Sequence, residues 1–402
     1  MRNALKKELA ILTTVGALTS LKLKSPFWTT LFAASAAGLM YSSSKKNFNY
    51  QGKKVYITGG SRGLGLSMAW NLLKLGAEVT LCARDKEELN RGRNILLKDF
   101  PQASVHISVV DITKTEELAQ SLDQAILQMG GIDLLVNNAG SILVGPFSSM
   151  EKEDFEAQVN LHLYAVVQAI GLIFPHFKSK GEGRILNICS LGGKIAVPHM
   201  LPYDASKFAL AGFSQGVTAE LAPHNILVTT AFPTVMRTGS PIQAVFKGDH
   251  GKEFQWFETI DNLPLLSMSA DTAAKKVLQA VIDGQSEIIL SGPAKLRLFF
   301  GNFFPETMNA LMGLVAAVLP TKDSAFRKTG ADSDNRFYQN PYLKPIQIRA
   351  QKVQDQYNQI PHHNAEFNMG LSDKTLNNPL SDGLNGPFDE SVQEQSPPDL
   401  KH

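Results

Sequence analysis

The chain has 402 residues, of which 44% are hydrophobic and 19% charged, a composition that excludes a wholly disordered or fibrous protein. Its formal net charge is only +2, which gives no indication of a nucleic-acid partner. The two cysteines, Cys82 and Cys189, are too few for a disulfide-stapled secreted scaffold, so a reducing compartment is expected.

The first 50 residues form an apolar and basic segment. It carries seven Lys or Arg against one Glu, and residues 25–44 contain no charge. About 20 residues suffice for a helix to cross a bilayer, although Ala, Ser and Thr make this a marginal span. A membrane anchor or hairpin, a cleaved targeting peptide, and an amphipathic helix lying on a surface all fit this pattern. We expect membrane association, and the basic residues on both sides leave the orientation open.

Short apolar runs alternate with helical patterns between residues 51 and 293. Strands are expected at 53–58, 78–83, 104–110, 132–137, 183–190, 226–232 and 286–290. Helices are expected at 64–76, 86–99, 114–129, 151–178, 202–221 and 270–283. Strands separated by helices form right-handed βαβ units. The pattern therefore predicts an α/β domain with a doubly wound, parallel, seven-stranded sheet covered by helices on both faces.

Two further segments follow this domain. Residues 294–320 form a second apolar stretch, in which positions 298–319 hold one charge, Glu306, and are interrupted by Gly301 and Pro305. It is either a helix pair that covers the core or a surface that faces a membrane or a partner. Residues 321–402 form a polar tail, and its composition predicts disorder beyond about residue 353.

A glycine-rich turn joins the first expected strand to the first expected helix. Glycines let the backbone approach a diphosphate, and the N-terminus of the following helix faces the negative charge. The strand–turn–helix context therefore predicts a dinucleotide site. The turn reads Thr58-Gly59-Gly60-Ser61-Arg62-Gly63-Leu64-Gly65.

The end of the second strand bears on the choice of cofactor. An acidic residue there would bind the ribose 2′-hydroxyl of NAD, but this chain has Ala83 followed by Arg84. Arg62 in the glycine-rich turn adds a second guanidinium, and two such groups suit a 2′-phosphate. We therefore expect NADP(H) in preference to NAD(H), although Asp85 could neutralise Arg84.

The motifs resemble, in their order and spacing, those of the short-chain dehydrogenase/reductase family over residues 52–293. The resemblance implies a Rossmann-like fold and an NAD(P)-dependent oxidoreductase that acts on CH–OH groups. The motifs that carry it are Thr58-Gly59-xxx-Gly63-x-Gly65, Asp111, Asn137-Asn138-Ala139-Gly140, Asn160, Ser190 and Tyr203-Asp204-Ala205-Ser206-Lys207. The cofactor-binding set it implies is Gly59, Ser61, Arg62, Gly63, Leu64, Gly65, Arg84, Asp111, Ile112, Asn138, Ala139, Gly140, Tyr203, Lys207, Pro233 and Thr238.

Four residues form the expected catalytic set. Tyr203 and Lys207 lie four apart on an expected helix, so they share one face, and a nearby ammonium would lower the pKa of the phenol. Tyr203 could then act as general acid or base, and Ser190, at the end of a strand, could hydrogen-bond the substrate oxygen. By resemblance, Lys207 also holds the nicotinamide ribose, and Asn160 holds a water that links Lys207 to solvent.

One motif departs from the family pattern, and the histidines give no indication of a metal site. Pro233-Thr234 replaces the usual Pro-Gly after the sixth strand, which puts the local backbone geometry in doubt but not cofactor binding. His162, His176 and His199 show no ligand spacing, so no metal site is expected.

The segment 239–268 is where this family builds its substrate lid. Its apolar residues suggest a hydrophobic ketone or alcohol resembling a lipid, retinoid or steroid. They are Phe246, Phe254, Trp256, Phe257, Leu263, Leu265 and Leu266.

The remaining expectations concern setting and alternatives. The need for reduced NADPH places the catalytic domain on the cytoplasmic side of a membrane. A homo-oligomer could form through the helices at 151–178 and 202–221. A non-catalytic, membrane-tethered NADPH sensor or scaffold is the main alternative, and a sugar epimerase is disfavoured by the glycine spacing.

Overall fold

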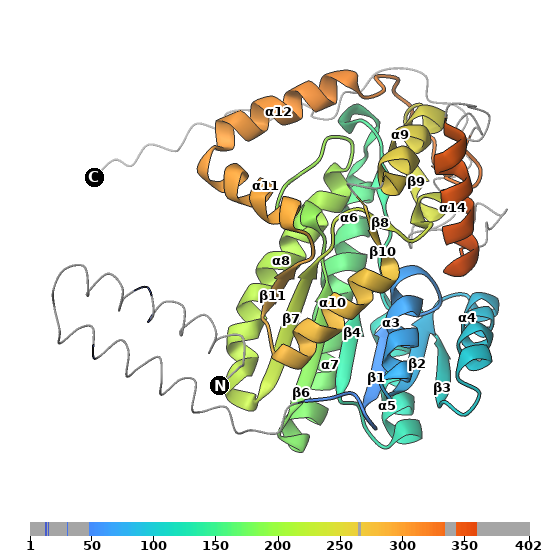
Figure 1. Ribbon diagram of the computed structural model, residues 1–402, viewed down its shortest axis with the longest axis vertical. Coiled ribbons are helices and arrows are strands. Elements are labelled where there is room, and N and C mark those ends of the chain that lie inside the picture. Colours follow the sequence, from blue (N-terminus) through green and yellow to red (C-terminus); the bar gives the residue numbers. More distant parts are fainter. Residues whose placement is uncertain are drawn as a thin grey trace, which may run out of the picture.

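The computed structural model describes residues 48–263, 267–333 and 343–359, together with Thr13, Val15 and Thr30. Seven parallel strands form its main sheet in the order β11-β7-β6-β4-β1-β2-β3 (Figure 1). This confirms the predicted doubly wound sheet and its seven strands. The strands are β1 (Lys54–Thr58), β2 (Glu78–Ala83), β3 (Val105–Val109), β4 (Leu134–Asn137), β6 (Gly183–Ile188), β7 (Ile226–Phe232) and β11 (Glu287–Ile289).

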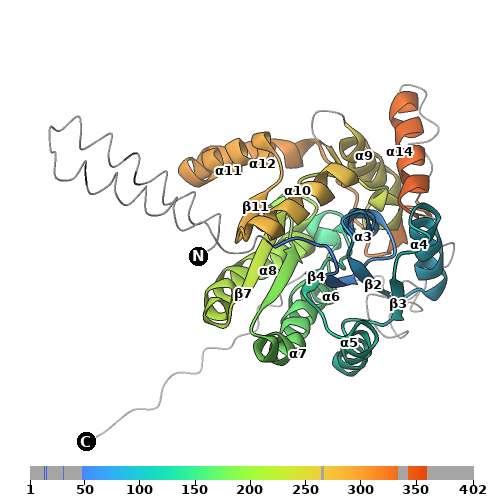
Figure 2. The same cartoon turned by 60° about the horizontal axis from the view of Figure 1, so that its bottom comes forward.

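Helices cover both faces of the sheet, as expected (Figure 2). One face carries α3 (Gly63–Lys74), α4 (Lys86–Asp99) and α10 (Ala270–Asp283). The other carries α5 (Thr115–Met129), α6 (Lys152–Val159), α7 (Ala165–Lys180) and α8 (Leu201–Leu221). Successive apolar side chains of a strand point to opposite faces of the sheet, so Val55 packs in the core on one face and Tyr56 in the core on the other.

The predicted helix at 151–178 is one long helix with a local irregularity. A π-helical turn, η2 (Asn160–Tyr164), joins α6 to α7. By length and composition the whole segment, Lys152–Lys180, could cross a membrane. Its side chains Ala169, Ile173 and Phe177 are buried against the sheet, so we interpret it as a core helix.

Short elements that the sequence did not indicate lie outside the main sheet. Two small sheets contain β5 (Leu143–Val144), β9 (Val245–Phe246) and β12 (Lys328–Thr329), and β8 (Met236–Arg237) with β10 (Met268–Ser269). Helix α9 (His250–Asn262) belongs to the expected lid segment. The short 3-10 helices are η1 (Phe147–Ser149), η3 (Leu191–Gly193), η4 (Ala222–His224) and η5 (Ser240–Gln243).

The second apolar stretch forms a helical hairpin. Helices α11 (Gly292–Phe303) and α12 (Pro305–Val318) meet at Phe304, where Pro305 starts a new helix. In Figure 1 the hairpin lies on one side of the upper edge of the sheet, and α9 with α14 (Lys344–Gln356) lies on the other.

The ends of the domain differ from expectation. Tyr50 is buried, and its hydroxyl donates to the carbonyl of Leu278 at 2.8 Å, so the folded domain includes the residues just before 51. The predicted disorder beyond about residue 353 is wrong for residues 354–359, because α14 continues to Gln356 and the next three residues are buried. Residues 360–402, and residues 25–44 apart from Thr30, lie outside the described part of the chain.

Candidate active site

A cavity of about 1090 Å³ opens at the carboxyl ends of the parallel strands. It lies over β1 and β4, where the strand order reverses and doubly wound sheets bind their ligands. Every predicted site residue lines this cavity except Gly65 and Asn160. The fold therefore brings the glycine-rich turn, both arginines and the Ser190–Tyr203–Lys207 set into one space.

The glycine-rich turn has the shape that a dinucleotide needs. Gly59 and Gly63 have φ values of +64° and +56°, a region that side chains with a Cβ adopt at a cost. Gly65 is needed for close packing, because a Cβ on it would overlap the carbonyl of Gly59. Within the described residues no side chain caps the start of α3. The Gly63 N–H is bonded to a backbone carbonyl, that of Tyr357, so the other N–H groups of the first turn remain for a diphosphate. The residues present thus fit the predicted cofactor.

Asn138 fixes the position of this turn. Its side-chain amide donates to the carbonyls of Thr58 at 3.0 Å and Gly59 at 2.9 Å. The Thr58 hydroxyl accepts in return from the backbone N–H of Asn138 at 2.9 Å and of Ala139 at 3.1 Å. The motif after β4 therefore holds the glycine-rich turn as well as lining the cavity.

The two arginines predicted to select NADP(H) have different surroundings. Arg62 forms an ion pair with Glu88 at 2.6 Å, and the buried Glu88 carboxylate also accepts from the Ser61 hydroxyl. Burial lowers the pKa of Arg84, while the charges of Asp111 and Glu88 raise it. Glu88, which sequence reasoning missed, thus engages Arg62 and is also near enough to Arg84 to influence its pKa.

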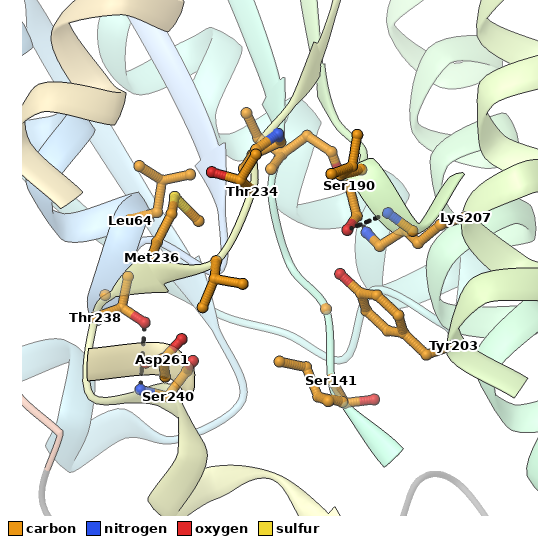
Figure 3. Close-up of a pocket in the computed structure, with 18 of the residues that line it drawn as sticks. Leu64, Ser141, Ser190, Tyr203, Lys207, Thr234, Met236, Thr238, Ser240 and Asp261 are labelled. Carbon is orange, nitrogen blue, oxygen red and sulfur yellow. Dashed lines mark hydrogen bonds between the residues drawn. The ribbon is translucent and has the colours of Figure 1, made fainter. Parts of the chain in front are cut away.

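Ser190, Tyr203 and Lys207 lie together on one side of the pocket, opposite Leu64 and Thr238 (Figure 3). The Lys207 Nζ lies 5.7 Å from the centre of the Tyr203 ring and donates to the carbonyl of Ile188 at 3.1 Å. The Ser190 Oγ accepts from the N–H of Gly192 at 3.0 Å. The arrangement leaves two hydroxyls and one amine around the point where a substrate oxygen would sit.

The protonation states in this cluster are set mainly by burial. Burial raises the pKa of Tyr203 above its ordinary range, and its hydrogen bond with Ser190 lowers it only in part. Burial also lowers the pKa of Lys207 to about 8. The direction at Tyr203 is opposite to the sequence-based expectation, because loss of solvent dominates and the opposing influence comes from Ser190 and not from Lys207.

His162 is a site residue that the sequence considered only as a metal ligand. It is 1% exposed, and its ring meets the ring of Tyr203 edge to face at 5.5 Å. Its Nε2 accepts from the N–H of Ser141 at 3.2 Å, so the proton of the neutral ring is on Nδ1, which donates to Ser206 at 2.7 Å. Burial and the charge of Lys207 hold its pKa well below the ordinary value. A neutral His162 thus supports the helix that carries Tyr203.

Asn160 does not enter the cavity. Its side chain is exposed, and its carbonyl accepts from the N–H of Ala165 within the π turn. The additional residue in this turn changes which side chains face inward, and it directs His162 toward Tyr203. The predicted role of Asn160 in holding a water stays a prediction.

Asp204, which follows Tyr203 on α8, and Arg297 both line the cavity. Asp204 is buried, and its Oδ2 accepts from the N–H of Val197 at 2.6 Å. Burial raises its pKa to about 8, although the charge of Arg297 on α11 acts against this. The sequence did not indicate that Arg297 lies near Asp204, because the two residues are 93 positions apart and no motif in the apolar stretch points to the site.

The lid residues divide into two groups. Trp256 and Phe257 line the cavity, whereas Phe246 and Phe254 are buried in a separate small core under the lid. Leu263 does not line the cavity. Leu265 and Leu266 lie outside the described residues. On the lid helix, burial also raises the pKa of Asp261, which lies on the same side of the pocket as Thr238 and Ser240 (Figure 3).

Comparisons with known proteins agree with this geometry. The sequence profile of the short chain dehydrogenase family matches residues 53–245. An uncharacterized oxidoreductase of Staphylococcus saprophyticus is 32% identical over 188 residues, which are 47% of this chain and 80% of that protein. A 3-dehydrosphinganine reductase of Danio rerio is 34% identical over 194 residues, covering 47% of this chain and 58% of the relative.

A similar structure has been solved with a dinucleotide. The short chain dehydrogenase of Burkholderia cenocepacia, in complex with NADP, superposes with a TM-score of 0.54 and 25% identity. The match covers 66% of this chain and 99% of that one. It covers more of the chain than the family profile, which matches residues 53–245.

The raised pKa of Asp204 predicts a pH-dependent stability. The folded protein holds a proton that the unfolded chain, with a carboxyl pKa of about 3.9, releases. Stability is therefore lost as the pH rises from about 4 to about 8. Asn at this position keeps the acceptor for Val197 and does not titrate. Between pH 5 and pH 8, Asp204→Asn should gain about 1 kcal/mol or more in free energy of unfolding relative to the wild type.

Denaturant titrations at both pH values measure this difference. The control is Asp123→Asn, whose side chain is exposed on α5. Parallel pH profiles for the wild type and Asp204→Asn would contradict the assignment of a buried, protonated carboxyl.

Proposed function

Because the chain belongs to the short-chain dehydrogenase family, we propose that it uses NADP(H) to interconvert a carbonyl and an alcohol on a hydrophobic substrate. The observation that carries the proposal is the single cavity in which the dinucleotide turn, Tyr203 and an apolar wall meet. The oxidoreductase relatives favour this over a non-catalytic NADPH sensor.

Tyr203 is the proposed general acid and base. The cofactor, when bound, would supply or accept the hydride. The buried Tyr203 phenol stays protonated at neutral pH, which is the form that can donate a proton to a carbonyl oxygen during reduction. Ser190 lies on the same side of the pocket, so both hydroxyls could bond the same substrate oxygen.

Lys207 is the proposed link between Tyr203 and the cofactor. With a pKa of about 8, the Lys207 side chain can change between ammonium and amine near neutral pH, so its charge can adjust to that of the phenol. His162, through Ser206, supports the helix turn that carries Tyr203. The chain thus supplies the proton and the orientation.

The far wall of the cavity supports an apolar substrate. It is built by side chains from the loops after β4 and β6, from the lid, and from the α11–α12 hairpin. They are Ile142, Ile195, Met200, Trp256, Phe257, Leu311, Met312 and Val315. Burial of such surface is worth about 0.8 kcal/mol per methylene, so the wall selects for long or bulky hydrocarbon. A relative named for a lipid ketone, 3-dehydrosphinganine, points the same way.

The hairpin also supports a membrane setting. Its outer side exposes Phe303 at 66%, Leu314 at 69% and Val318 at 83%. Leu311 lines the cavity and is itself half exposed, so the cavity wall and this apolar surface are continuous. Such a contiguous apolar patch marks an interaction site, and a lipid surface would let a membrane-dissolved substrate reach the cavity. We place the catalytic domain on the cytoplasmic side, where NADPH is available.

The proposed homo-oligomer has a surface available to it. Tyr164 and Val167 on the helix at 152–180 and Phe208 on α8 are exposed. These are the two helices that the family resemblance indicates for self-association.

Tyr203→Phe tests the proton donor. Removing the hydroxyl should lower carbonyl reduction by roughly 10²–10⁴-fold, because general acid catalysis is lost. NADPH should still bind, as measured by fluorescence titration. Tyr164→Phe, at an exposed tyrosine of the neighbouring helix, is the matched control. Wild-type turnover in the Tyr203 variant would remove Tyr203 from the mechanism.

Arg84→Ala tests cofactor selection. The wild type should bind NADPH more tightly than NADH, and the variant should narrow this gap by roughly 1.5–3 kcal/mol, the value of a hydrogen bond to a charged group. Arg62→Ala should have a smaller effect, because Glu88 already pairs with Arg62. Arg93→Ala, exposed on α4, is the control. Equal affinities of the wild type for both cofactors would refute the selection.

Membrane attachment can be tested in two steps. After a carbonate wash, full-length protein should remain with membranes, and protein lacking residues 2–46 should be released at least in part. In that shortened chain, Phe303→Glu with Leu314→Glu should reduce the remaining binding to phosphatidylcholine–phosphatidylserine vesicles. Leu127→Glu, 80% exposed on α5 away from the hairpin, should not. Full-length protein that is soluble without detergent would overturn the proposal.

A further inference from the structure

The end of the described C-terminal extension packs on the dinucleotide site. Helix α14 lies against α9, where Ala350 is buried in the small core under the lid. After Gln356 the chain leaves the helix, and Tyr357, Asn358 and Gln359 are each less than 8% exposed. We name these three residues the C-terminal clasp.

The clasp is bonded to the glycine-rich turn itself. The carbonyl of Tyr357 accepts from the N–H of Gly63 at 3.0 Å. The side-chain amide of Asn358 donates to the carbonyls of Ser61 at 2.9 Å and Glu88 at 3.0 Å. Asn358 adopts a left-handed backbone, with φ of 57°, that these bonds stabilise. A segment nearly 300 residues away in the sequence is therefore fixed to the turn that receives the diphosphate.

Tyr357 anchors the clasp on the far side of the turn. Burial raises the pKa of its hydroxyl, and the neighbouring Asp271 on α10 and Ser67 on α3 both influence this pKa. Arg91 on α4 donates to the Asn358 side chain at 3.4 Å. Three helices around the dinucleotide site thus hold the clasp, which indicates a built feature of the site.

Gln359 is the part of the clasp that faces the cavity. Its Nε2 lies 3.2 Å from the place where a Cβ of Gly63 would be, and its Cγ lies 3.0 Å from that of Gly239. It lines the same cavity as Gly63 and Thr238. Its Oε1 is buried and has no hydrogen-bond partner among the described residues. A diphosphate offers only acceptors and cannot bond this oxygen, but because the oxygen has no partner the amide can rotate without breaking a hydrogen bond to it.

We propose that Gln359 is a ligand of the NADP(H) diphosphate and that the clasp retains the bound cofactor. The diphosphate would lie between the start of α3 and Thr238, where the Gln359 amide is found. Rotation of this amide presents its N–H donors to the phosphate oxygens, a neutral donor to a charged acceptor. The extension, which the catalytic family core does not need, then becomes part of the cofactor site.

The test is made on the full chain, with binding as the measurement. Gln359→Ala should raise the dissociation constant for NADPH about tenfold, as expected for a lost hydrogen bond to a charged group. It should leave the affinity for 2′-AMP unchanged, because 2′-AMP has no diphosphate. Gln359→Glu should weaken NADPH further, by repulsion. Gln356→Ala, exposed at the end of α14, is the matched control.

A second variant tests retention. Asn358→Ala removes the two bonds to the turn, and NADPH should dissociate several-fold faster in a stopped-flow chase. Unchanged or tighter NADPH binding in Gln359→Ala would overturn the proposal and show a clasp that ignores or obstructs the cofactor. An equal loss of NADPH and 2′-AMP affinity would also overturn it, because the effect would then be general damage to the site.

Discussion

The parallel pairing of β1 with β4 is the constraint on which the site depends. Val55 lies opposite Leu134 and Ile57 opposite Val136, so the two strands end side by side and their following turns meet. Asn138 after β4 can therefore bond the carbonyls of Thr58 and Gly59 after β1. A shift of one residue in this register would turn each buried side chain to the other face of the sheet. The turn would then lose the support that shapes it for a diphosphate.

Burial governs the chemistry that this scaffold supports. The same loss of solvent raises the pKa of Tyr203 and Asp204 and lowers that of Lys207 and His162. Each shift favours the neutral form of its group, so this cluster tends toward neutrality. A cluster of this kind beside an apolar wall suits the hydrophobic carbonyl that we propose as the substrate.

The sequence could predict those features that depend on local spacing. The seven strands follow from β-branched runs such as 53–58, and the site of Tyr203 and Lys207 follows from their separation of four on a helix. The π turn at Asn160 could not be read from the residues, and it decides that His162 faces the site. Glu88, Arg297 and Gln359 reach the site only through tertiary packing. Glu88 lies 26 residues from Arg62 in the sequence, and the clasp that carries Gln359 lies nearly 300 residues from the glycine-rich turn. Composition alone indicated disorder where the clasp is in fact buried.

If one cavity holds the cofactor beside an apolar substrate wall, the turnover of ketones should depend on their hydrocarbon length. Steady-state oxidation of NADPH would be measured with straight-chain ketones that lengthen by one methylene at a time. We expect kcat/KM to rise by roughly threefold to fourfold per methylene until the wall formed by Trp256, Met312 and Val315 is filled, since each buried methylene is worth about 0.8 kcal/mol. A kcat/KM that stays flat or falls with chain length, while short polar ketones turn over well, would contradict it.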